Sequence, residues 1–114
     1  FSGVFAKVPF RQYNVWMLRF DWDAAKAAAN LKKHGVSFEE ATTVFADSDA
    51  LDGEDPKHST REVRCQRIGQ SVIGRILFVV YTARKVAHEK ETIRIISARQ
   101  ASRKERQAYT GLAN

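Results

Sequence analysis

Cysteine and long apolar runs are scarce in this sequence, and each scarcity excludes a class of protein. The 114 residues include one cysteine, so no intramolecular disulfide can stabilise the fold and a cysteine-rich metal site is excluded. A reducing cytoplasm is the compartment that fits such a chain. The longest apolar run, Ile76–Tyr81, is far shorter than the roughly 20 residues that cross a bilayer, so we expect no membrane association.

Motifs for metal and nucleotide chemistry are missing as well. The sequence has no zinc-ligand spacing, no phosphate-binding glycine loop and no nucleophile elbow. Its paired acidic residues, Glu39 with Glu40 and Asp47 with Asp49, have no convincing metal-binding partner. We therefore expect no cofactor and no metal.

The length predicts one globular domain, and the 44% hydrophobic content can supply one core. Residue 1 is Phe and the only methionine is Met17. Residues 1–16 are a native extension, a processed remnant or vector-derived sequence, and their charges are too few for a signal peptide. We expect the domain to occupy residues 17–114.

Charge is unevenly distributed along the chain. The net charge is +6, yet residues 37–60 hold seven acidic side chains against one lysine, so the other 90 residues carry +12. Clustered lysine and arginine side chains give salt-dependent affinity for phosphates. The sequence therefore favours a polyanionic partner over mere solubilising charge.

The first half of the domain predicts a strand and two helices. Leu18–Trp22 alternates apolar and charged residues, as a half-buried strand does. Asp21 or Asp23 can cap a helix over residues 24–34, which Gly35 ends. The sequence from Ser37 to Glu40 is a capping box that opens a second helix to about Phe45. Residues 47–60 predict a loop with at most a short extended piece around Leu51.

The second half predicts an antiparallel meander followed by a helix. Three strand-like segments lie at residues 62–68, 75–82 and 92–98, joined by turns at residues 69–74 and 84–91. The middle strand is apolar on both faces and should be the most buried. A capping box from Ser102 to Glu105 opens a basic helix that ends near Tyr109 or Leu112. We predict an α+β fold with about four antiparallel strands, two N-terminal helices and one C-terminal helix.

Several short motifs, in their order along the chain, resemble the BrnT family of toxins. The first motif is Lys26 with Asn30 and then residues 33–38. The middle portion matches at Asp55–Ser59 with Arg61 or Glu62, at Arg67–Gly69, at Gly74–Leu77 and at Val79–Thr82. The C-terminal signature covers Arg94–Arg99, Ala101–Ser102 and Glu105–Arg106. The resemblance spans about Leu18 to Tyr109.

The resemblance implies a RelE-like fold and an endoribonuclease that cleaves messenger RNA. It also implies a cognate antitoxin, a BrnA-like ribbon-helix-helix protein, through which alone the toxin would reach operator DNA. Ala83 stands where an acidic residue is common in the family. If that residue takes part in catalysis, a non-catalytic co-repressor that binds the antitoxin is the alternative.

Metal-free RNA cleavage needs a proton acceptor, a proton donor and cations that face the developing phosphorane charge. We predict these catalytic residues: His34, His58, Arg84, Arg94 and Arg99. His34 could instead cap its helix end, and His58 could be a surface residue of a loop, whereas His88 lies outside the family motifs. Arg84 could join Arg94 across the hairpin. Arg94 and Arg99 are five positions apart, so they share a face only if the strand ends or bulges near Ser97.

A second set of residues is expected to contact RNA: Lys33, Arg67, Tyr81, Arg103 and Arg106. Tyr81 could stack on a base, although its place in an apolar run favours the core. Arg84, Arg94 and Arg99 could equally form a solvated rim or contact the antitoxin. For the antitoxin we expect the C-terminal basic helix and the strand edge near Arg94 to be covered.

Overall fold

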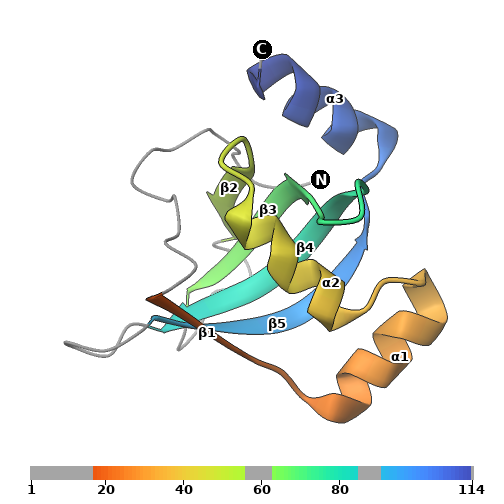
Figure 1. Cartoon of the computed structure of the whole chain (residues 1–114), viewed down its shortest axis with the longest axis vertical. Helices are drawn as coiled ribbons and strands as arrows, with labels where there is room; N and C mark the ends of the chain where they lie inside the picture. Colours follow the sequence, from red (N-terminus) through yellow and green to blue (C-terminus); the bar gives the residue numbers. More distant parts are fainter. Residues whose placement is uncertain (1–16, 56–62, 85–90, 114) are drawn as a thin grey trace.

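A computed structural model describes residues 17–55, 63–84 and 91–113 of the chain (Figure 1). The elements, in order, are β1 Leu18–Asp21, α1 Ala24–His34, α2 Phe38–Thr42, the short 3-10 helix η3 Thr43–Ala46, β2 Leu51–Glu54, β3 Arg64–Gln70, β4 Ile76–Arg84, β5 Glu91–Gln100 and α3 Arg103–Ala113. The strands form one sheet in the order β1-β5-β4-β3-β2. The α+β class and the positions of the main helices are confirmed.

The sheet differs from the predicted one in two respects. It has five strands, because Leu51–Glu54 pairs antiparallel with β3 where the sequence predicted a loop with at most a short extended piece. It is also mixed, because β1 lies parallel to β5 while the other neighbours are antiparallel. The prediction of about four antiparallel strands was therefore wrong in number and direction. The long connection from β1 to β5 lets the two run the same way, which a tight hairpin cannot do.

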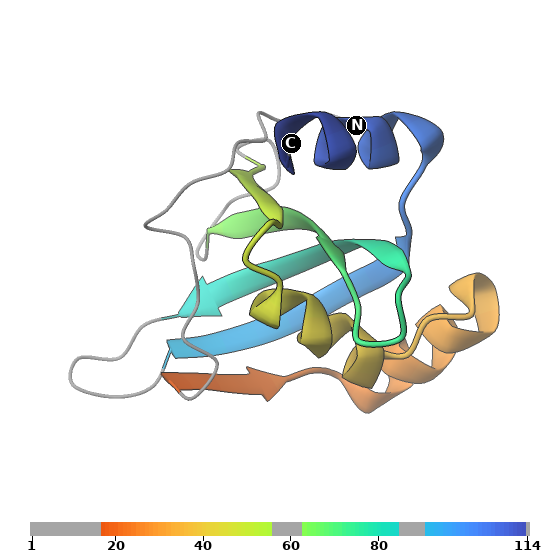
Figure 2. The same ribbon diagram turned by 45° about the horizontal axis from the view of Figure 1, so that its top comes forward.

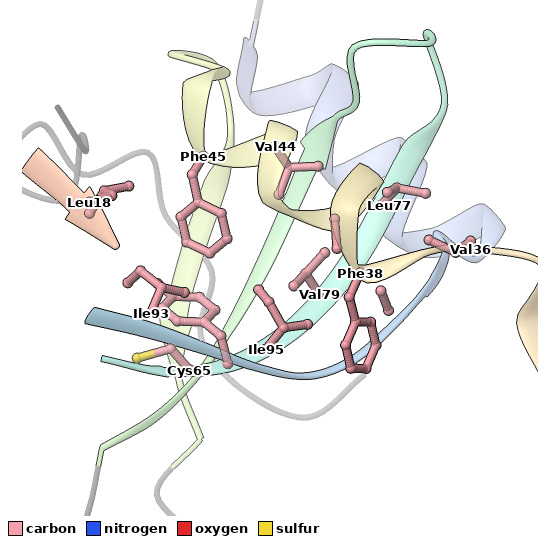
Figure 3. Close-up of a cluster of buried hydrophobic side chains, with 13 residues drawn as sticks. Leu18, Val36, Phe38, Val44, Phe45, Cys65, Leu77, Val79, Ile93 and Ile95 are labelled. Atoms are coloured by element: carbon pink, nitrogen blue, oxygen red, sulfur yellow. The ribbon is translucent and has the colours of Figure 1, made fainter. Parts of the chain in front are cut away.

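Helices cover the two faces of the sheet unequally. Elements α1, α2 and η3 pack on one face, called the helical face below, and α3 lies on the opposite side (Figure 2). The main core fills the helical face and is shown in Figure 3. Its buried members are Leu18, Val36, Phe38, Ala41, Val44, Phe45, Cys65, Leu77, Val79, Tyr81, Ile93, Ile95 and Ala98. A smaller cluster under α3 buries Leu51, Ile68, Phe78, Val80 and Ala101, and leaves the rest of that face for other contacts.

The helix boundaries follow the capping signals of the sequence. The Asp23 side chain accepts a hydrogen bond from the backbone N–H of Lys26 at the start of α1, and Gly35 ends that helix in the left-handed conformation. Ser37 accepts from the N–H of Glu40 at the start of α2. These caps confirm the predicted starts of both helices.

The C-terminal helix opens with a reciprocal capping box. The backbone N–H of Ser102 donates to Glu105 at 2.7 Å, and the N–H of Glu105 donates back to the Ser102 hydroxyl at 3.2 Å. The predicted N-terminus of α3 is confirmed, and the helix continues to Ala113.

A β-bulge in β5 decides which side chains share a face. Val80 pairs with Ser97 and Tyr81 pairs with Ile95, so Ile96 is an extra residue without an opposite partner in β4. Arg94 lies opposite Thr82 and Arg99 opposite Phe78. Because residues 78 and 82 of β4 point the same way, the bulge places both arginines on one face, as the sequence required for a shared site.

Candidate functional site

Arginine side chains gather on the sheet face opposite α1 and α2, at the end farthest from the β3–β4 turn. The strand pairings align Asp21, Arg94, Thr82 and Arg64 in one cross-strand row and Arg19, Thr92 and Arg84 in the next. Side chains directly opposite in such rows lie about 5 Å apart at Cβ. We call this surface the arginine face and define it by Arg19, Arg64, Arg84 and Arg94.

Strict alternation along the strands produces this face. In β1, Leu18 and Phe20 pack into the core, so Arg19 points the other way. In β5, Ile93 and Ile95 are buried and Arg94 between them is exposed. Four cations from four strands thus share one face of the sheet, with Arg19, Arg84 and Arg94 exposed and Arg64 partly buried.

A hollow of about 230 Å³ lies within the arginine face. It is lined by Asp21, Thr82, Arg84, Thr92 and Arg94. Arg94 donates to the Asp21 carboxylate at 2.8 Å, and the two side chains are 45% and 53% exposed. An ion pair that is this exposed to solvent contributes little to stability, and it leaves Arg94 accessible. Two guanidinium groups and two hydroxyl donors around one hollow are suited to a phosphate oxygen.

Arg99 shares the face but is held by α3. It donates two hydrogen bonds to the Glu105 carboxylate, at 2.7 and 2.9 Å, and its guanidinium lies 4.3 Å from the centre of the Phe78 ring. Burial raises the pKa of Glu105, but the bonds from Arg99 and from the Ser102 N–H outweigh it, so the net pKa lies below its usual value. Arg99 therefore anchors α3 to the sheet in this structure.

His34 lies far from the arginine face. It ends α1, and the carbonyl of the next residue, Gly35, accepts a hydrogen bond from Arg75 just before β4. Arg84 ends the same strand eight residues after Ile76, a span of roughly 26 Å at the usual rise of an extended strand. The structure thus separates His34 from Arg84 and Arg94. His58 and His88 lie outside the described residues.

Arg67 and Tyr81, predicted to contact RNA, are instead in the interior. Arg67 is 3% exposed and donates to the Asp52 carboxylate at 2.8 Å. The Tyr81 hydroxyl donates to the same carboxylate, and its ring lies edge-on to Phe45. Because both side chains are buried among core residues, we no longer assign them to an RNA surface.

The other residues expected to contact RNA are exposed. Lys33 lies in the last turn of α1, and Arg103 and Arg106 lie on α3. Arg106 donates to the carbonyl of Ala101, which leaves its side chain at the helix surface. The lysine and the α3 arginines are on different helices on opposite sides of the sheet, so they do not form one cluster.

Sequence reasoning missed the contributions of Arg19 and Arg64 to the site. The alternation in residues 18–22 already placed Arg19 on the polar face of its strand. The missing information was the neighbour of that strand, because β1 pairs with β5 across about 70 residues of chain. Pairing at that separation has no local sequence signal.

The described residues offer no obvious metal centre. Across 17–55, 63–84 and 91–113, no three His, Cys, Asp or Glu side chains come close enough to hold an ion. None of the helices described is long and apolar enough to cross a membrane.

Comparison with known proteins identifies the family. Residues 22–105 match the sequence profile described as the ribonuclease toxin BrnT of type II toxin–antitoxin systems. The fold is similar to the crystal structure of the Brucella abortus ribonuclease toxin BrnT, with 24% sequence identity and a TM-score of 0.51, covering 75% of this chain and 99% of that chain. No curated protein sequence matches. The resemblance seen in the sequence motifs is confirmed, and the chain belongs to the BrnT family of ribonuclease toxins of type II toxin–antitoxin systems.

Proposed function

We propose that this toxin is a metal-independent endoribonuclease that binds RNA across the arginine face and acts in the cytoplasm. Its neutralising partner would be a BrnA-like ribbon-helix-helix antitoxin, through which it would reach operator DNA. The observation that carries the proposal is the hollow beside Arg84 and Arg94, where two cations, two hydroxyl groups and the Asp21 carboxylate paired with Arg94 surround a space of about 230 Å³. The single cysteine of the chain supports a reducing compartment.

In this proposal the arginine face positions RNA and stabilises charge. The 2′-oxygen loses its proton and bonds to the neighbouring phosphorus as the bond from phosphorus to the 5′-oxygen breaks and that oxygen takes up a proton, and the transition state places extra negative charge on the phosphate oxygens. Arg84 and Arg94 supply cationic donors for that charge, with Arg19 and Arg64 on the flanking strands for neighbouring phosphates. Arg99 acts as a positioning residue, because its two hydrogen bonds to Glu105 hold α3 against the sheet. The acid and base remain predictions, with His58 as the remaining candidate because His34 lies at the other end of β4.

The test compares RNA cleavage in EDTA by the wild type and by the Arg84→Gln/Arg94→Gln variant. We expect the wild type to cleave and the variant to lose at least on the order of a hundredfold in rate. Its RNA affinity should also depend less on salt, by about two phosphate contacts. The matched control is Lys26→Gln/Lys32→Gln, which removes two charges from exposed positions of α1. Intact RNA with the wild type, or equal rates in both double variants, would refute the proposal.

A second candidate is a non-catalytic co-repressor that holds its antitoxin on operator DNA. It is favoured because the arginine face carries no histidine among the described residues, and because Ala83 replaces an acidic residue common in the family. Induction of the toxin gene alone distinguishes the two. Arrest relieved by the co-expressed antitoxin supports the ribonuclease, whereas normal growth with abundant folded protein supports the co-repressor.

A further inference from the structure

The tip of the β3–β4 hairpin exposes two large apolar side chains. Val72 is 77% exposed and its neighbour Ile73 is 65% exposed. The other exposed large apolar residues among those described, Met17, Leu31 and Val63, do not adjoin one another in sequence. Single exposed apolar residues are ordinary on protein surfaces, whereas an adjacent pair on a projecting turn calls for a reason.

The tip is held in place by polar contacts from the helical layer. The N–H of Val72 donates to the Thr43 hydroxyl at 2.9 Å, and the Ser71 hydroxyl donates to the Glu40 carboxylate at 2.7 Å. Arg75 forms an ion pair with the same carboxylate, and its hydrogen bond is the main cause of the lowered pKa of Glu40. The exposed pair therefore belongs to a fixed surface, with little ordering cost when a partner binds.

A groove of about 540 Å³ lies directly beside the tip, on the helical side of the molecule. It is lined by Phe20, Thr42, Thr43, Ala46, Asp47, Gln70 and Val72. Val72 thus belongs both to the projecting tip and to the wall of the groove. Together, the groove and the tip form one continuous surface, which we call the hairpin groove.

The charge at the hairpin groove comes from one acidic residue. Asp47 is the one charged residue among the described residues that line the groove, and the exposed Glu39 lies one helical turn before Thr42 and Thr43 on the same helical segment. No lysine or arginine is among the described residues that line the groove, and the nearby Arg75 is paired with Glu40. Such a surface suits a partner that combines apolar side chains with lysine or arginine better than it suits RNA.

We propose that the hairpin groove is a docking site for the antitoxin, which would insert an amphipathic segment carrying apolar and basic residues. The inference rests on the assignment of this chain as the toxin of a type II pair, since that assignment supplies a protein partner. The groove lies on the helical side, whereas the arginine face is on the opposite side of the sheet. Affinity for the antitoxin and cleavage of RNA can therefore be separated by mutation.

The experiment titrates purified full-length toxin with its purified cognate antitoxin by calorimetry, at low and at high salt. Val72→Ser/Ile73→Ser should weaken binding by about tenfold or more, because truncated apolar anchors commonly cost this much. Ala46→Arg, a change at an exposed position of the groove, should weaken binding by filling the groove and repelling a basic segment. Neither variant should alter RNA cleavage.

Two further variants complete the design. Leu31→Ser removes another exposed large apolar residue, 50% exposed in α1, and should leave affinity unchanged. Arg103→Glu/Arg106→Glu tests the α3 surface expected from the sequence. The proposal is overturned if the hairpin and groove variants bind within twofold of wild type. Absence of RNA cleavage by the wild type would refute the ribonuclease proposal alone, because the binding titration does not depend on it.

Discussion

Replacement of Asp52 tests whether the buried arginine of β3 has a structural role. The Asp52 carboxylate is 2.8 Å from an Arg67 nitrogen, and the two side chains are 4% and 3% exposed. The Asp52→Asn variant leaves the Arg67 charge buried without its carboxylate, a change that typically costs about 3–5 kcal/mol. Arg67 also donates to the carbonyls of Val44 and Asp47, so we expect the lower end of that range.

Urea unfolding followed by circular dichroism measures this loss, and the melting temperature should fall by roughly 10–20 °C. Glu39→Gln, an exposed change in α2, is the control and should alter stability by less than about 0.5 kcal/mol. Adding Arg67→Met to Asp52→Asn should recover part of the loss, because the buried charge that lost the Asp52 carboxylate is then removed. A loss below about 1 kcal/mol for Asp52→Asn would refute the reasoning. Weaker RNA binding by a fully stable Arg67→Met variant would show instead that Arg67 contacts RNA.

Two further predictions concern pH and a buried amide. Glu40 and Glu105 have lowered pKa values in the fold, so their contribution to stability is present above the usual carboxyl pKa and is lost as the pH falls through the lowered values. The urea midpoint of the wild type should therefore fall as the pH is lowered from about 5 to about 2. The midpoint of Glu105→Gln should fall less steeply, and parallel plots of midpoint against pH for the two proteins would contradict this. The Asn30 side chain donates to the carbonyls of Val36 and Ala98 and accepts from the Ala98 N–H. Asn30→Ala should cost about 2–4 kcal/mol in thermal melts, and a loss under about 1 kcal/mol would show that these bonds contribute little.

Capping residues made the helices predictable, whereas the sheet depended on distant contacts. Asp23, Ser37 and Ser102 each satisfy a helix N-terminus through a neighbour three residues away, so the signal is local. The strand β2 has the sequence Leu-Asp-Gly-Glu, which is polar and resembles a loop. It is a strand because Asp52 finds Arg67 and Tyr81 as buried partners, and these lie 15 and 29 residues further along the chain.

The candidate site was predictable where it depended on a hairpin and unpredictable where it depended on β1. Arg84 and Arg94 belong to consecutive strands, and the structure brings them to one hollow as their order suggested. Arg19 joins them only through the parallel pairing of β1 with β5. Arg67 is not at the surface expected of a charged residue in a strand, because the buried Asp52 carboxylate pairs with it. Tyr81 lies in the core, which its apolar run favoured over base stacking.

The extra residue in β5 has a consequence for the comparison of related chains. Ile93 and Ile95 follow one alternation and Ala98 follows the shifted one, so the phase changes at Ile96 and Ser97, two successive residues that are both partly buried. A relative without a residue at position 96 would still present the same side chains on each face, with the two arginines four positions apart instead of five. An alignment gap placed here preserves both faces, whereas the same gap placed beside Arg94 would exchange core and solvent residues along half of the strand. In this strand, the position of a deletion therefore decides whether Arg94 and Arg99 stay on one face of the sheet, whereas a substitution leaves the alternation of the two faces unchanged.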